Sequence, residues 1–139
     1  DVSGLKVVVG SGTNQERILL GWNQQNKRQH LPEATPVYLT DDAAVNLALL
    51  SGRVDVLFGP QSAASYKAAL TGKTRVVGLG PKLAQVAVTT KKGNGLVYAL
   101  QAALDSSIKN GTYQQVMTRW GEQKEAVTAS KVNPPGITY

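Results

Sequence analysis

The chain has 139 residues, of which 42% are hydrophobic and 17% are charged, a balance that is typical of an ordered globular protein and excludes a disordered one. It contains no cysteine, which excludes a disulfide framework, and no apolar run approaches the roughly 18 residues that a membrane-spanning helix needs. The formal net charge is +6, but the basic residues are scattered and the only adjacent pairs are Lys27-Arg28 and Lys91-Lys92, so we expect no nucleic-acid partner.

Short runs of β-branched residues alternate with amphipathic segments over the first 80 residues. The runs predict strands at residues 6–10, 36–40, 54–58 and 74–79. The amphipathic segments predict helices at residues 13–26, from a cap at Thr40 or Asp41 to Gly52, and at 61–70. Strands that alternate with helices form right-handed crossovers, so the predicted fold class is α/β, with an open, mainly parallel sheet flanked by helices.

The pattern changes after Pro81. One more strand is predicted at residues 85–90, and leucines spaced by four predict a helix at 96–108. A shorter helix is expected at 112–120, followed by an extended tail that contains two adjacent prolines. The chain is therefore expected to divide near residues 80–85 into a βα array and a helical C-terminal segment.

Ligands of open parallel sheets bind at the carboxyl ends of the strands, where loops lead into helix N-termini. Three such junctions are predicted here, at residues 11–15, 40–42 and 59–62. They should lie together, and the glycine at position 12 lets the backbone approach a ligand closely. Their uncharged polar groups suit reversible binding of a small polar solute. The residues expected to face the ligand are Ser11, Thr13, Asn14, Gln15, Thr40, Gly59 and Gln61.

The first junction also has a purely structural interpretation. Thr13 and Glu16 have the spacing of a capping box, in which the threonine oxygen accepts from the amide of residue 16 and the glutamate reaches back. Capping leaves the amides of residues 14 and 15 for a bound anion, although the carboxylate of Glu16 would oppose one. The two interpretations are compatible, and both stay open.

Motifs for catalysis, cofactors and metals are missing from the sequence. A GxGxxG dinucleotide motif that begins at Gly10 needs its third glycine at Gln15, and there is no GK[ST] phosphate loop. His30 is the single histidine and has no second ligand at metal-binding spacing. Asp41 and Asp42 could act as an acid or base, but carboxylates at a helix start are first of all partners of the helix dipole. We therefore expect no catalytic residue, no metal and no cofactor.

Three stretches of the chain resemble one known family. They are LKVVVGSGTNQE, LLSGRVDVLFGPQSAASY and VAVTTKKGNGLVYALQAALDSSIKNGTYQQVMTRWG, in that order. Together they are similar to the family 3 solute-binding proteins of ABC transporters, which bind polar amino acids. The GT-x-QE helix start, the SGRVD strand start and the C-terminal stretch are the most specific parts of this resemblance.

The resemblance implies a type II periplasmic-binding-protein fold, in which two lobes close on a solute and deliver it to a membrane permease. Residues 1–80 would form a βαβαβ ligand-binding lobe. Residues 81–139 would supply a return strand, two helices and a tail that belong to the other lobe or pack on it. Backbone amides at Thr13, Asn14 and Gln15 would hold the ligand's carboxylate. A periplasmic or extracellular location, with or without membrane association, is also implied.

Two features depart from the family pattern. Five residues after Asp55 the family has an acid that grips the ligand's amino group, but this chain has Pro60, so a contact from Gln61 is expected instead. The family's first lobe has no match here, so the chain is expected to be a fragment whose partner is the missing lobe or a second copy. Its two C-terminal helices would expose apolar faces unless such a neighbour covers them.

The predicted function is reversible solute binding without catalysis, and other classes of protein stay open. One is an enzyme on the same clamp fold, a dehydratase or a lytic transglycosylase, with Asp41 or Asp42 as its acid or base. Another is the ligand-sensing module of a signalling receptor, which passes a change of shape to a partner. A flavodoxin-like domain is a further alternative, against which the lack of a hydroxyl-rich phosphate loop counts.

Overall fold

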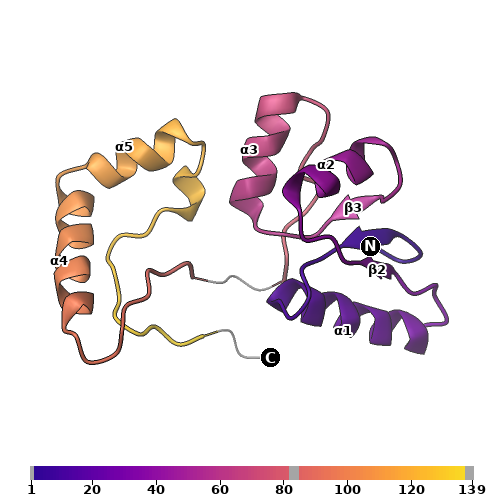
Figure 1. The fold of residues 1–139 in the computed structure, drawn as a ribbon, viewed down its shortest axis with the longest axis horizontal. Helices are drawn as coiled ribbons and strands as arrows, with labels where there is room; N and C mark the ends of the chain where they lie inside the picture. The colour runs from indigo at the N-terminus through magenta and orange to yellow at the C-terminus, as the bar shows by residue number, and fades with distance from the viewer. Residues whose placement is uncertain (1, 82–84, 137–139) are drawn as a thin grey trace. The chain divides into compact units, whose positions relative to one another are not determined.

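The computed structural model describes residues 2–81 and 85–136, and the chain divides by its internal contacts into two units, Asp1–Gly78 and Leu79–Tyr139 (Figure 1). The boundary expected at residues 80–85 lies partly outside the described residues. The first unit is α/β, with a small open sheet of three parallel strands, and the second unit is helical. None of the helices in the described part of the chain combines the length and the hydrophobicity that crossing a membrane would require.

The sheet of the first unit has the strand order β2-β1-β3. The strands are β1 (Lys6–Val8), β2 (Thr35–Val37) and β3 (Val56–Leu57). In the middle strand, Val7 pairs with Pro36 on one side and with Val56 on the other. The valines at residues 7–9 are at most 2% exposed. A central parallel strand is covered on both faces, which explains why β1 is a continuous run of valine rather than an alternation of apolar and polar residues.

Two helices cover opposite faces of this sheet, α1 (Asn14–Arg28) and α2 (Asp42–Leu50) (Figure 1). Successive side chains of a strand point to opposite faces, so Val7 packs with Leu19 of α1, whereas Val8 packs with Val45 of α2. Right-handed crossovers produce this arrangement, because the chain moves from β1 to β2 in one direction and back past β1 to β3 in the other. The strands and helices predicted over residues 6–70 are confirmed, although the strands are shorter than expected.

Polar side chains help to fix where the outer strands begin. Asn23 of α1 is 6% exposed, and its side chain donates to the carbonyl of Ala34 at 2.7 Å and accepts from the N–H of Ala34 at 2.8 Å. Both backbone groups of Ala34 are therefore satisfied inside the protein, just before β2. Just before β3, the carboxylate of Asp55 accepts from the N–H of Lys6 at 2.8 Å, across 49 residues of chain.

The α/β alternation ends earlier than the sequence predicts. Helix α3 (Gln61–Thr71) follows β3 and is ended by a glycine with a φ of 63°, the left-handed conformation that favours glycine. The strands predicted at residues 74–79 and 85–90 do not form, so that prediction is wrong. Val77 is 72% exposed and Val86 is 101% exposed, because no strand among the described residues pairs with either segment. β-Branched residues favour an extended backbone but do not supply a pairing partner.

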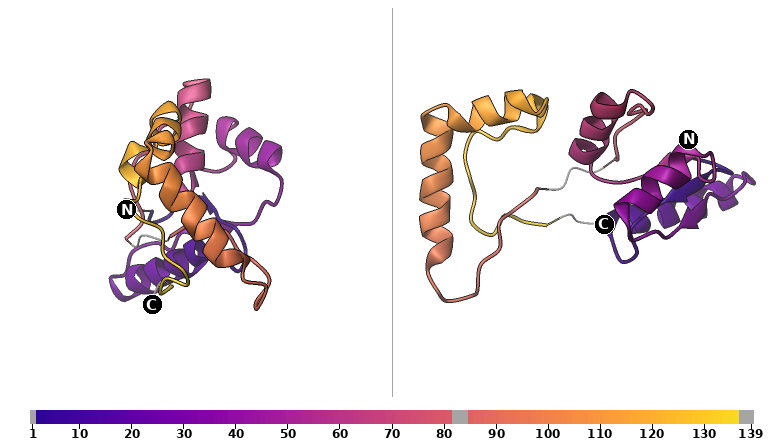
Figure 2. Two further views of the ribbon diagram at one scale, coloured as in Figure 1. Left: turned by 90° about the vertical axis from the view of Figure 1, so that its left-hand side faces the viewer. Right: turned by 45° about the horizontal axis from the view of Figure 1, so that its top comes forward.

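The second unit consists of α4 (Leu96–Lys109), α5 (Thr112–Arg119) and the short 3₁₀ helix η1 (Gln123–Glu125). The two helices predicted after residue 95 are confirmed. The tail runs back beside α4 (Figure 2), where the carboxylate of Asp105 accepts hydrogen bonds from the N–H and the hydroxyl of Ser130, each at 2.8 Å. None of the described residues of this unit is buried, so that part of the chain has no apolar core of its own.

Candidate functional site

The carboxyl ends of the three strands meet at one edge of the sheet because the strands are parallel. The backbone hydrogen bonds continue up to this edge, where Val9 donates to the carbonyl of Val37 at 3.2 Å and Phe58 donates to the carbonyl of Val8 at 2.9 Å. The three loops therefore begin side by side. These three loops and the first turns of the helices that follow them are called the carboxyl edge. The carboxyl edge comprises residues 9–16, 38–42 and 58–62.

The chain leaves the carboxyl edge toward opposite faces of the sheet after β1 and after β3. Helix α1 packs on one face and α2 on the other. Helix α3 follows β3 and lies on the α2 side, where Lys67 and Asp42 form an ion pair at 3.4 Å. The ends of β1 and β3 therefore form a topological switch point, which is the place where open α/β sheets bind their ligands.

The junction after β1 is a helix cap with a modified register. The hydroxyl of Thr13 accepts from the N–H of Glu16 at 3.3 Å and donates to the carbonyl of Gly10 at 2.6 Å. The carboxylate of Glu16 accepts from the N–H of Gly12 at 2.6 Å. The capping box predicted from the sequence would pair this carboxylate with the N–H of Thr13 instead. Gly12 has a φ of 72°, and a Cβ at Gly10 would lie 2.9 Å from the Thr13 methyl group, so both glycines are needed for this turn.

A side chain that sequence reasoning missed joins the first two loops. Tyr38, just after β2, hydrogen-bonds the carboxylate of Glu16, and this contact is the main reason why the pKa of Glu16 lies below its ordinary value. The N–H of Gly12 lowers the pKa of Glu16 further, and the same contact with Glu16 raises the pKa of Tyr38. Glu16 is therefore ionised at neutral pH beside the first turn of α1. Its negative charge opposes an anion at that helix terminus.

The residues predicted to face a ligand all lie on the carboxyl edge, at different exposures. Ser11, Asn14 and Thr40 are exposed, and the half-buried ones are Thr13, Gln15, Gly59 and Gln61. Thr13 serves the helix cap. Among the described residues, no acceptor takes the main-chain N–H of Gln15, which leaves that donor for a ligand.

The junctions after β2 and β3 begin their helices differently. Asp41 caps α2, since its carboxylate accepts from the N–H of Ala44 at 2.8 Å, which confirms the helix cap predicted at Thr40 or Asp41. Pro60 precedes α3 and makes no side-chain hydrogen bond to it. The polar side chains that this junction can offer are those of Gln61 and Ser62, in the first turn of α3.

Within residues 2–81 and 85–136, no three acidic or histidine side chains are grouped as a metal ion would require. His30 follows the C-cap of α1 in the sequence, has a φ of 56° and is exposed. It is therefore part of the turn that leads from α1 to β2.

No family model, curated protein or solved structure matches this chain. The resemblance to solute-binding proteins therefore rests on the sequence stretches alone. The geometry of the carboxyl edge is an independent argument about what the chain binds.

Proposed function

We propose that the chain is part of an extracytoplasmic solute-binding protein that binds a small polar solute reversibly, without catalysis, for uptake by an ABC transporter. The solute class that fits best is an amino acid or a related compound that carries an amino group. The type II periplasmic-binding fold, with residues 1–80 as one lobe, belongs to this proposal, as does a periplasmic or extracellular location.

The observation that carries the proposal is the topological switch point at the carboxyl edge. Three loops begin side by side there. Apart from the acids Glu16, Asp41 and Asp42, their polar groups are uncharged amides and hydroxyls, and they contain no phosphate loop. Amides and hydroxyls of this kind exchange hydrogen bonds with a solute at little cost in charge desolvation. This composition favours reversible binding.

The charge at the carboxyl edge favours the amino end of such a solute. Glu16 has two donors, the N–H of Gly12 and the hydroxyl of Tyr38, and a carboxylate can accept further hydrogen bonds. An ammonium group on the solute would be a third donor and would neutralise the charge. Glu16 would thus take the role that the acid at position 60 has in the family, because Pro60 cannot.

Isothermal titration of the chain against amino acids, small amines and small carboxylates tests the proposal. We expect saturable binding of a compound that contains an amino group and weaker or no binding of simple carboxylates. Glu16→Gln and Gln61→Ala should each weaken that binding about tenfold, the effect of losing one hydrogen bond to a charged or polar group.

Gln24→Ala is the matched control, because Gln24 is exposed on α1 and lies outside the carboxyl edge. It should leave the affinity unchanged. Simple carboxylates that bind more tightly than amines would contradict the assignment of Glu16, and an absence of binding to every compound in the panel would contradict the proposed function itself.

A further inference from the structure

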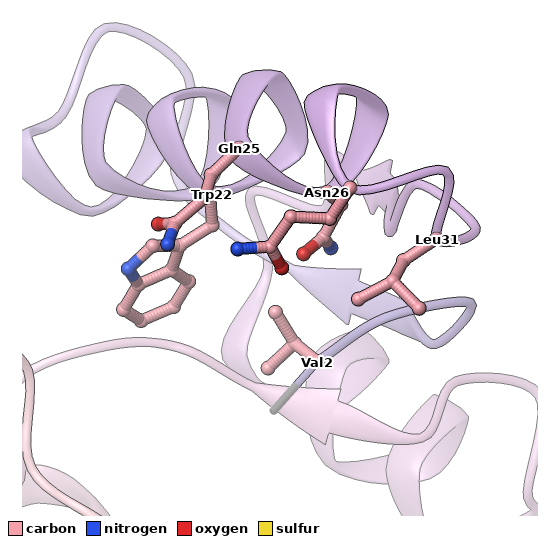
Figure 3. A pocket seen from close by; sticks show the side chains of 6 residues that line it. Val2, Trp22, Gln25, Asn26 and Leu31 are labelled. Carbon is pink, nitrogen blue, oxygen red and sulfur yellow. The ribbon is translucent and has the colours of Figure 1, made fainter.

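A hollow lies against the C-terminal half of α1 (Figure 3). The cavity has a volume of about 380 Å³, and it is lined by Val2, Trp22, Gln25, Asn26, Gln29 and Leu31. We call it the α1 pocket. Its size lies within the range of pockets that hold small molecules, and it shares no residue with the carboxyl edge.

One end of the α1 pocket is a rigid aromatic wall. The ring of Trp22 stacks on the ring of Phe58, with centroids 5.1 Å apart and an interplanar angle of 21°. Phe58 and Val2 pack against the same apolar cluster as α1 does, so the wall is anchored to the sheet. An aromatic ring held in this way offers a flat apolar contact at a small cost in side-chain entropy.

An amide side chain of low exposure lines the same pocket. Asn26 is 8% exposed, and its side-chain N–H donates to the carbonyl of Pro32 at 3.4 Å, which fixes the orientation of the amide. Figure 3 shows Asn26 and Trp22 on the pocket side of α1, above Val2. The side-chain oxygen of Asn26 is an acceptor that a hydroxyl group of a ligand in the pocket can use.

The remaining polar groups of the pocket are uncharged. Gln25 and Gln29 are four residues apart on α1 and therefore lie on the same face of the helix, where each offers one donor group and one acceptor. None of the six lining side chains is ionisable. Such a site has no charge that could neutralise a charged ligand. Its amides can exchange hydrogen bonds with hydroxyl groups, and its aromatic wall can pack against the C–H face of a ring.

We propose that the α1 pocket binds an uncharged, hydroxylated small molecule of the size of a sugar ring. This site is separate from the carboxyl edge and does not depend on the function proposed for that edge. The amides of Gln25, Asn26 and Gln29 hold the hydroxyl groups, and Trp22 packs against the ring.

The two indole N–H signals in an NMR spectrum of the ¹⁵N-labelled chain can test this proposal directly. The chain has two tryptophans; Trp22 lines the pocket, and Trp120 belongs to the other unit and serves as an internal control. Titration with glucose or myo-inositol should shift the Trp22 signal to saturation and leave the Trp120 signal in place. Cyclohexanol, which keeps the ring but has one hydroxyl group, should bind more weakly.

Variants distinguish the pocket from general surface binding. Gln25→Ala and Gln29→Ala should each weaken the binding of the sugar about tenfold, since each removes hydrogen bonds to hydroxyl groups. Gln24→Ala, which changes an exposed neighbour outside the pocket, should have no effect. A linear shift of the Trp22 signal without saturation, an equal loss of affinity in Gln24→Ala, or tighter binding of cyclohexanol than of glucose would overturn the proposal.

Discussion

The two units of this chain contain similar amphipathic helices, but different forces hold them. In Asp1–Gly78, the valines of the middle strand and side chains of α1 and α2 form two apolar clusters that exclude water. In the described part of Leu79–Tyr139, apolar side chains of α4 and α5 stay partly exposed, and hydrogen bonds such as those between Ser130 and Asp105 hold the tail. An amphipathic helix buries its apolar face only where a sheet or another helix supplies the second layer.

The difference in burial between the two units determines how much a substitution in each unit should change the free energy of unfolding. Complete burial of a leucine or valine side chain stabilises a protein by about 1.5–3 kcal/mol. A hydrogen bond between exposed groups contributes about 1 kcal/mol or less, because water competes for both partners. Substitutions should therefore have large effects in the first unit and small effects in the second.

The largest effect is expected at Leu19, whose side chain is 0% exposed. Leu19→Ala would leave a cavity between α1 and the sheet and should lower the free energy of unfolding of the first unit by about 2–5 kcal/mol. Urea unfolding, followed by the amide NMR signals of β1, measures this loss. Leu20→Ala on the same helix is the control, since Leu20 is 43% exposed and should lose less than about 1 kcal/mol.

The same change in the second unit sharpens the comparison. Leu104 of α4 is 38% exposed, so Leu104→Ala should have a smaller effect on urea unfolding than Leu19→Ala has. Equal losses at Leu19 and Leu104 would mean that the two units do not differ in the way described above.

The next largest effect is expected at Asn23. Asn23→Ala removes the partner of both backbone groups of Ala34, and leaving buried groups unpaired costs about 1–3 kcal/mol. Hydrogen exchange at the Ala34 amide should accelerate accordingly. Gln24→Ala, at the exposed neighbouring position, should leave this exchange rate unchanged. An unaltered rate in Asn23→Ala would show that the hydrogen bond to Asn23 is not what protects the Ala34 amide.

A smaller, pH-dependent effect is expected at Asp105. Hydrogen bonds from the N–H and then the hydroxyl of Ser130 lower the pKa of Asp105 below its ordinary value of 3.8. Its contribution to stability is therefore present above that ordinary value and is lost as the pH falls through the lower pKa of the folded state. The NMR shift of the Ser130 amide should follow this titration, and Asp105→Asn should abolish it. Glu125→Gln, which changes an exposed acid nearby in sequence, should not.

The smallest effect concerns the carboxyl edge. Because the hydroxyl of Tyr38 is the main cause of the lowered pKa of Glu16, Tyr38→Phe should raise this pKa toward its ordinary value of 4.5. The stabilisation by Glu16 is complete above that value and is lost at lower pH, as the carboxylate takes up a proton. Carboxyl ¹³C NMR across the acid range measures the shift. A pKa of Glu16 that does not move would contradict the contact with Tyr38.

Local patterns in the sequence predicted the helices of both units and the three strands of the sheet, because such patterns depend on residues that are close together in the chain. The valine run of β1, the cap at Asp41 and the apolar spacing of α4 each specify an element without reference to distant residues. The same reasoning failed at residues 74–79 and 85–90. Their β-branched residues are typical of a strand, but a strand also needs a neighbour, and composition does not reveal whether one exists.

The candidate site was predictable in its position but not in its electrostatics. The rule that ligands bind at the carboxyl ends of parallel strands placed the three loops at one edge. The contact between Glu16 and Tyr38 joins residues that are distant in sequence, and it depends on how β2 aligns with β1. No local motif predicts such a contact. Once the pairing of the strands is known, a tyrosine at the end of β2 is a reasonable candidate for a contact with the loop after β1.

The central position of β1 has a consequence for synthesis of the protein. The bond between Lys6 and Asp55 spans 49 residues, so β3 becomes available long after β1 has been made. On a ribosome that adds about 5–20 residues per second, the delay is roughly 2–10 seconds. Until β3 has been made, one edge of β1 has no strand to pair with. The central strand of the finished sheet is thus an edge strand until its last neighbour has been added.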